Sequence, residues 1–291
     1  MLHIIAAAIA LMLHPGDPQP LPAQVQDRVG DTYEIRLMNI SETSSDNGSS
    51  GSSRSGGMLV ERVVAVRDDG VELEFDLPSD TTAEDRARDW QWPARVLRSA
   101  DGSLQLLNTP ELEARIDAWL ALGQFPREAC GRWIFTWNAF KIECDPQSVI
   151  DTLRLYDLRL GDIHDGASYT EPGGLRPTLL RLDSSGPEGS VFVAETLVDP
   201  DFVRRERAQS DVVVAEIMGE PKSLEAALQS RSEEQVTGGI TTTLITAADG
   251  RVVRRTRVTS LVTTATEGVV ERSTSTLTTE RRPLDRAGTP P

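Results

Sequence analysis

Apolar and polar residues alternate through the first third of the chain. The alternation is clear in residues 31–37 and 58–77, where apolar side chains recur between charged ones at the period of a strand with one buried face. Asp69 and Gly70 interrupt the second run, and such a pair adopts the backbone conformation of tight hairpin turns. Residues 31–107 are therefore predicted to form a first, antiparallel β region.

A second β region is predicted at residues 178–282. Its last part holds three long strands, separated by acid-glycine turns at 249–250 and 267–268. These strands carry threonine on both faces, a residue with strand propensity but little apolar surface. The sheet is therefore expected to line a polar concavity or to stand partly in water. The apolar run at 211–218 fits either a strand or a helix.

Between the β regions the apolar residues recur at helical spacing. Leu112, Ile116 and Leu120 fall on one face, and Thr109 is expected to cap the helix that carries them. The pattern predicts a helical insert around residues 109–158.

The insert contains both cysteines of the chain, Cys130 and Cys144. A disulfide between them is compatible with two local structures. One is a helix followed by an extended return, and the other is a hairpin of two strands closed by the disulfide. A further helix is expected after Asp145 and Pro146.

The order of these elements predicts an α+β protein dominated by an antiparallel, curved, half-barrel-like sheet. This layout resembles the curved half-barrels of bacterial envelope proteins that carry lipids or lipoproteins. The resemblance implies an apolar small molecule or an envelope protein as partner. The threonine-rich strands depart from the apolar concave face that a lipid carrier needs.

A single domain is expected at residues 24–282, although the two β regions could also form separate domains. Residues 41–57 are rich in serine and glycine and offer little to bury, so they are predicted to be a disordered loop. The tail at 283–291 is also expected to be disordered.

The N-terminus carries an apolar run at residues 2–13, which is shorter than the roughly 20 residues needed to cross a bilayer. Helix-breaking residues and a small-residue site at Ala23 follow it. Residues 1–23 are therefore interpreted as a signal peptide, which predicts a periplasmic protein with no transmembrane segment in the mature chain. Export favours a disulfide over free thiols.

The charge of the chain argues against nucleic-acid binding. It has 45 acidic and 30 basic residues and a net charge of -15, which repels phosphate. No metal site or cofactor is expected, because too few histidine and cysteine donors remain and no nucleotide-binding motif is present. Glu72, Glu74 and Asp76 alternate along one strand, and a solvated strand face explains them better than a calcium site.

No catalytic residue is assigned, but one loop is a candidate. His164 is the only histidine beyond the predicted cleavage site, and Asp162 and Asp165 flank it. These acids could orient the imidazole, although no nucleophile motif accompanies it. Two arginine clusters are candidate anion contacts, with solvated ion pairs as the default interpretation. Their members are Arg204, Arg205, Arg207, Arg254, Arg255 and Arg257.

The first functional hypothesis is a non-enzymatic, exported binding or envelope-associated protein. A hydrolase that uses His164 is the second, and a structural or interaction module that uses the threonine-rich strands is the third.

Overall fold

The computed structural model describes residues 27–135, 139–161 and 163–284. The predicted signal peptide at 1–23, most of the predicted tail at 283–291 and Asp162 therefore lie outside the described residues.

Ten antiparallel strands form one curved, open sheet, so the predicted α+β class is confirmed. Its order from edge to edge is β10 (Arg181–Gly186), β11 (Gly189–Leu197), β12 (Gln235–Thr246), β13 (Val252–Thr264), β14 (Val270–Pro283), β1 (Thr32–Ser45), β2 (Ser50–Arg67), β3 (Gly70–Asp76), β4 (Ala94–Ser99) and β5 (Leu104–Leu106). Two small pairs are β6 (Trp133–Phe135) with β7 (Ala139–Lys141) and β8 (Ser168–Tyr169) with β9 (Thr178–Leu179).

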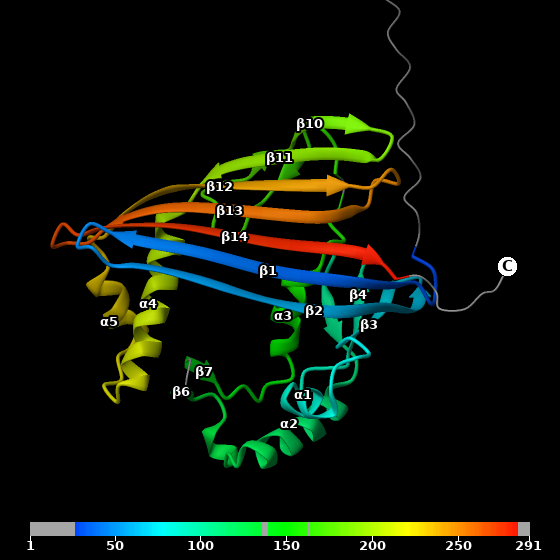
Figure 1. Cartoon of the computed structure of the whole chain (residues 1–291), viewed down its shortest axis with the longest axis horizontal. Helices are drawn as coiled ribbons and strands as arrows, with labels where there is room; N and C mark the ends of the chain where they lie inside the picture. The colour runs from blue at the N-terminus through cyan, green and yellow to red at the C-terminus, as the bar shows by residue number, and fades with distance from the viewer. Residues whose placement is uncertain (1–26, 136–138, 162, 285–291) are drawn as a thin grey trace, which may run out of the picture.

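The α-helices all lie on the same side of the sheet (Figure 1). They are α1 (Ala83–Arg88), α2 (Thr109–Gly123), α3 (Ser148–Tyr156), α4 (Pro200–Ile217) and α5 (Leu224–Ser230), with a short 3-10 helix, η1 (Arg127–Ala129). We call the side of the sheet that faces them the inner face. No helix among the described residues is both long and apolar enough to cross a membrane.

The two predicted β regions form one sheet because the first and last strands pair. β1 and β14 are antiparallel neighbours from Tyr33 opposite Pro283 to Ser45 opposite Glu271. This pairing joins the N-terminal strands to the long C-terminal strands at the centre of the sheet (Figure 1).

The prediction of a disordered loop at residues 41–57 is wrong. Residues 41–45 and 50–57 belong to β1 and β2, residues 46–49 form the turn between them, and the two strands pair from Thr32 opposite Arg62 to Ser44 opposite Ser50. Main-chain hydrogen bonds, rather than buried side chains, hold this serine-rich hairpin in the sheet. One glycine also has a packing role, because a Cβ at Gly57 would collide with the hydroxyl of Tyr156.

The apolar helix faces are confirmed, whereas one predicted cap is wrong. Leu112, Ile116 and Leu120 of α2 are buried. Asn108, not Thr109, precedes the helix, and its amide is used elsewhere: it accepts from Arg95 N–H and donates to the Pro93 carbonyl. The ambiguous run at 211–218 is the C-terminal half of α4.

The insert is only partly helical. Between α2 and α3 the chain forms the β6–β7 hairpin, so the hairpin alternative is confirmed and the helix with an extended return is wrong. Gly131 N–H donates to Ile142 and Ile142 N–H donates to Arg132, which extends the pairing toward the cysteines.

The expectation of a solvated acidic face at residues 71–77 fails at Glu72. Its side chain is 2% exposed and forms ion pairs with Arg67 and Arg95 from the neighbouring strands. The aliphatic stems of such arginines can shield a carboxylate while their charge compensates it.

Candidate functional site

The inner face changes character along the sheet. Beneath β1–β5 it is apolar, and Ile35, Leu59 and Leu73 pack there against α2 and α3. Beneath the threonine-rich strands it is mixed, because Ile240 and Leu244 of β12 belong to two smaller apolar clusters while polar side chains from β13 and β14 lie beside them. Thr279 and Arg255 both donate to the carbonyl of Leu155 at the end of α3. The predicted polar surface therefore corresponds best to the inner face of β13 and β14.

A buried ion network lies at the boundary between these two regions. Glu61 of β2 is 1% exposed and accepts hydrogen bonds from Arg159 and Arg281. Asp27 accepts from Arg159. The Arg281 guanidinium lies over the ring of Tyr33, with its central carbon 3.4 Å from the ring centroid. The network connects β1, β2, β14 and the loop after α3.

The charges of this network compensate one another. Burial alone would raise the pKa of Glu61, but the guanidinium groups of Arg159 and Arg281 outweigh it and lower that pKa to about 2. Glu61 is therefore ionised at neutral pH although it is buried.

A cleft of about 1050 Å³ opens beside the network, where β10 turns into β11 and β12 turns into β13. Arg98, Arg159, Arg251 and Arg281 line it from four separate elements. Its apolar lining comes from Leu158, Leu160, Ile163, Leu182, Phe192 and Val252. The cleft therefore combines a charged wall with an apolar surface.

Two glycines of the cleft have no packing reason to be glycine. A Cβ at Gly161 or Gly186 would meet no atom within 4 Å, and neither residue has a positive φ. Both line the cleft. Their main-chain groups are accordingly open to a molecule in the cleft.

His164 and Asp165 of the candidate loop line this cleft, and both are exposed. The Nδ1 atom of His164 lies 2.9 Å from the main-chain carbonyl of Asp165. The Asp165 carboxylate instead accepts from Leu182 N–H on the edge strand β10, at 2.8 Å. Asp165 thus satisfies a donor at the edge of the sheet, and a pairing of His164 with Asp162 stays a prediction.

Serines also line this part of the cleft. The hydroxyls of Ser185 and Ser190 are 2.9 Å apart and hydrogen-bonded to each other across the β10–β11 hairpin. A histidine and two serines therefore share one cleft.

The six candidate arginines are not brought together. Arg204 and Arg207 tie α4 to Glu234, which is buried, while Arg205 of the same helix is exposed. Successive β13 residues point to opposite faces of the sheet. Arg254 pairs with Glu280 on the outer face, whereas Arg257 pairs with Glu171 on the inner face.

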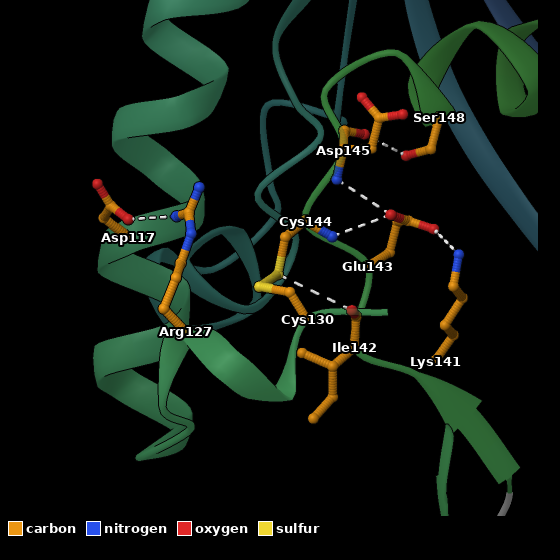
Figure 2. Close-up of a disulfide and its surroundings, with 9 residues drawn as sticks. All are labelled: Asp117, Arg127, Cys130, Lys141, Ile142, Glu143, Cys144, Asp145 and Ser148. Atoms are coloured by element: carbon orange, nitrogen blue, oxygen red, sulfur yellow. Dashed lines mark hydrogen bonds and ion pairs between the residues drawn. A yellow bond between two sulfur atoms is a disulfide. The ribbon is translucent and has the colours of Figure 1, made fainter. Parts of the chain in front are cut away.

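The disulfide between Cys130 and Cys144 is confirmed, with the two Cα atoms 5.5 Å apart (Figure 2). It closes the base of a hairpin that we call the finger, of which residues 130–135 and 139–144 are described. Glu143 fixes the return strand by accepting from the main-chain N–H groups of Cys144 and Asp145. The finger reaches α4, where Trp133 N–H donates to Glu216.

Sequence reasoning missed Glu61, Arg98, Arg159 and Arg281. A detectable pattern existed for Glu61, because it occupies the middle of an apolar face between Leu59 and Val63. A charged residue at such a position needs a partner of opposite charge. No pattern identified the partners, since they lie about 100 and 220 residues away along the chain.

A second, smaller groove of about 440 Å³ lies where β9 diverges from β11, and Leu175, Leu197 and Ile240 line it. Among the described residues, no group of three or more histidine, cysteine, aspartate or glutamate side chains is arranged to hold a metal ion.

No family model and no curated protein matches this chain. Lipovitellin, solved in a study of its lipid–protein interactions, is similar at a TM-score of 0.39 and 12% identity, over 90% of this chain and 26% of that one. The attachment invasion locus protein Ail of Yersinia pestis matches with a TM-score of 0.20 and 4% identity, over 88% of this chain and 100% of Ail. An outer membrane channel from Pseudomonas putida F1 matches with a TM-score of 0.20 and 9% identity, over 91% of this chain and 99% of the channel chain. This chain thus spans about a quarter of the lipovitellin chain, and TM-scores this low support no inference about function.

Proposed function

We propose that this protein is a non-enzymatic, envelope-associated binding protein of the periplasm, which holds a small, partly apolar molecule in the cleft beside the Glu61 network. The single observation that carries the proposal is the cleft itself, at about 1050 Å³. Ligand sites are typically concave spaces of roughly 300 to 1000 Å³, mostly apolar with a few placed polar groups.

The surroundings of the cleft support a preformed site. Arg159 and Arg281 are 13% and 6% exposed, and each forms ion pairs with both Glu61 and Asp27. Side chains fixed in this way lose little conformational entropy when a ligand binds. Turns carried by a rigid sheet are common positions for binding residues.

Export of the chain belongs to the same proposal. The disulfide supports it, because such bonds persist in oxidising compartments. Mass spectrometry of the protein from its native host is expected to find Gln24 as the first residue. An intact N-terminus on the protein in the cytosolic fraction would contradict this part.

The binding role is tested by recovering the ligand. Protein purified from its native host is extracted and its small molecules are identified by mass spectrometry. Gly186→Trp is designed to fill the cleft without backbone strain, and Ser52→Trp adds the same bulk to an exposed position on the serine-rich hairpin. An enriched compound is expected with wild type and Ser52→Trp and not with Gly186→Trp.

The proposal fails if wild type carries no enriched compound, or if Gly186→Trp retains it. The hydrolase alternative rests on the presence of His164, Ser185 and Ser190 in the same cleft. It predicts ester turnover that is lost in His164→Ala. Equal turnover by wild type and this variant would exclude it.

A further inference from the structure

Two guanidinium groups keep donors that the protein itself does not use. Arg98 directs Nε to Asp157 and Nη2 to the carbonyl of Arg159. Arg281 directs Nε and Nη2 to Glu61. Within the described residues, the Nη1 atom of neither arginine forms a hydrogen bond, and neither atom is fully buried.

Both of these arginines line the cleft. Their Nη1 groups therefore offer N–H donors from its wall to an acceptor oxygen of a ligand. Because each guanidinium is held by its other nitrogens, these donors are fixed in place before a ligand arrives.

The charge around the cleft decides which kind of oxygen fits. The four guanidinium groups are matched by carboxylates that pair with them: Asp27, Glu61, Asp157 and Asp249. Asp101 and Asp165 add two further carboxylates to the lining. The cleft thus has no surplus positive charge, in a chain with a net charge of -15. An anionic ligand is disfavoured, whereas a neutral carbonyl oxygen is not.

The two additional carboxylates already accept hydrogen bonds from the protein, and the Ser103 hydroxyl is one donor to Asp101. Asp101 accepts from Ser103 N–H and Asp165 from Leu182 N–H. Carboxylates have several lone-pair sites, so both can also accept from an N–H or ammonium group of a ligand. The same lining includes Leu160 and Phe192, which favour an apolar side chain.

We propose that the cleft binds a short, apolar peptide with a neutral or positive charge. Its main-chain carbonyl groups accept from Arg98 and Arg281, its apolar side chain contacts Leu160 and Phe192, and its terminal amine lies toward Asp101 and Asp165. This assignment rests on the proposed binding function and names its ligand class.

The test uses three peptides that share one apolar body and differ in charge. Leucyl-leucine amide carries a positive charge, its N-acetylated form is neutral, and N-acetyl-leucyl-leucine acid is negative. Isothermal titration calorimetry with the full mature chain is expected to give the tightest binding for the positive peptide. The negative peptide is expected to bind roughly tenfold more weakly or not at all.

Variants separate charge from fold. Asp101→Asn with Asp165→Asn keeps an acceptor at each position and removes both charges. It is expected to weaken the positive peptide roughly threefold to tenfold and to leave the neutral peptide unchanged. Arg98→Lys is expected to weaken the neutral and positive peptides alike, because it loses the fork of donors. Arg254→Lys on the outer face is the matched control.

Two results overturn the assignment: equal or tighter binding of the negative peptide, or a charge preference that survives the double aspartate variant. If no peptide binds while the native protein carries another compound, the peptide assignment fails and the proposed function stands. If the native protein carries no compound and no peptide binds, both fail.

Discussion

The two halves of the inner face solve the same packing problem in different ways. Under β1–β5, the sheet is covered by apolar side chains of α2 and α3, such as Leu112, Ile116 and Leu153, all 0% exposed. Under β12–β14, buried residues such as Thr242 and Thr279 form hydrogen bonds to Glu171 and to the end of α3.

The difference separates interactions that mainly stabilise the fold from interactions that mainly fix the positions of side chains. Burial of apolar surface contributes roughly 25 cal/mol per Å² and depends little on direction. A hydrogen bond contributes only about 1 kcal/mol net but requires a defined geometry. The hydrogen-bonded half is thus suited to hold side chains in fixed places around the cleft, while the larger of the apolar clusters lies under β1–β5.

The largest expected effect is at the boundary between the halves. Glu61→Ala leaves Arg159 and Arg281 with one buried counterion fewer, and breaking such a pair costs about 4 kcal/mol of unfolding free energy. Urea denaturation measures it. Glu34→Ala, which removes an ion pair with the exposed Arg36 on β1, is the control and should cost much less. Equal losses of unfolding free energy in the two variants would show that the buried network stabilises the fold no more than an exposed ion pair does.

The apolar half should respond almost as strongly to a cavity. Leu153→Ala on α3 is expected to cost about 3 kcal/mol, because the residue is fully buried in the larger core. Leu155→Ala on the same helix removes a side chain that is 44% exposed and should cost much less. Similar midpoints for both variants in urea would contradict the packing described above.

Acid should weaken the boundary in a way that depends on Glu61. Its pKa is about 2 in the folded protein, below the roughly 4.3 of an unfolded glutamate. The stabilisation is therefore complete above about pH 4.3 and is lost as the pH falls toward 2, by roughly 3 kcal/mol. The unfolding free energy of wild type should fall more steeply over this window than that of Glu61→Gln. Parallel curves would contradict the pKa assignment.

The disulfide contributes to the apolar half through the finger. Replacing both Cys130 and Cys144 by serine is expected to cost about 2 to 3 kcal/mol, since the cross-link closes a loop with a sequence separation of 14. Wild type treated with dithiothreitol should lose the same amount. A loss seen only in the double variant would point to the serine hydroxyls and not to the bond.

The smallest expected effect is the loss of stability when a threonine on the inner or the outer face of the sheet is replaced by valine. Thr279→Val removes a buried donor to the Leu155 carbonyl and should cost about 1 kcal/mol. Thr256→Val on the outer face should change stability by less than about 0.5 kcal/mol, because that side chain is only half-buried. A larger loss at Thr256 would reverse the assignment of the faces.

The fold was predictable where side-chain pattern and backbone structure coincide. The alternation around Asp69 and Gly70 predicted a hairpin, and the spacing of Leu112, Ile116 and Leu120 predicted the buried face of α2. The cysteine pairing followed from their number and from the expected export. In each case, neighbouring residues carried the information.

The pattern failed where stability comes from distant partners. Residues 41–57 have few apolar side chains, yet they form strands because β14 and β2 supply main-chain partners on both sides of β1. The prediction of the candidate site was incomplete for the same reason. Arg159 and Arg281 resemble ordinary surface arginines in the sequence, and only the fold places both of them beside Glu61.

The pairing of β1 with β14 also has a kinetic consequence. This pairing joins residues as far apart in sequence as Tyr33 and Pro283, so the sheet cannot be completed until nearly the whole described chain is available. Contacts this distant in sequence slow folding, because a long loop must close before they form. During synthesis, one edge of β1 would stay unpaired until β14 is made. An unpaired strand edge of this kind is prone to pair with the wrong strand.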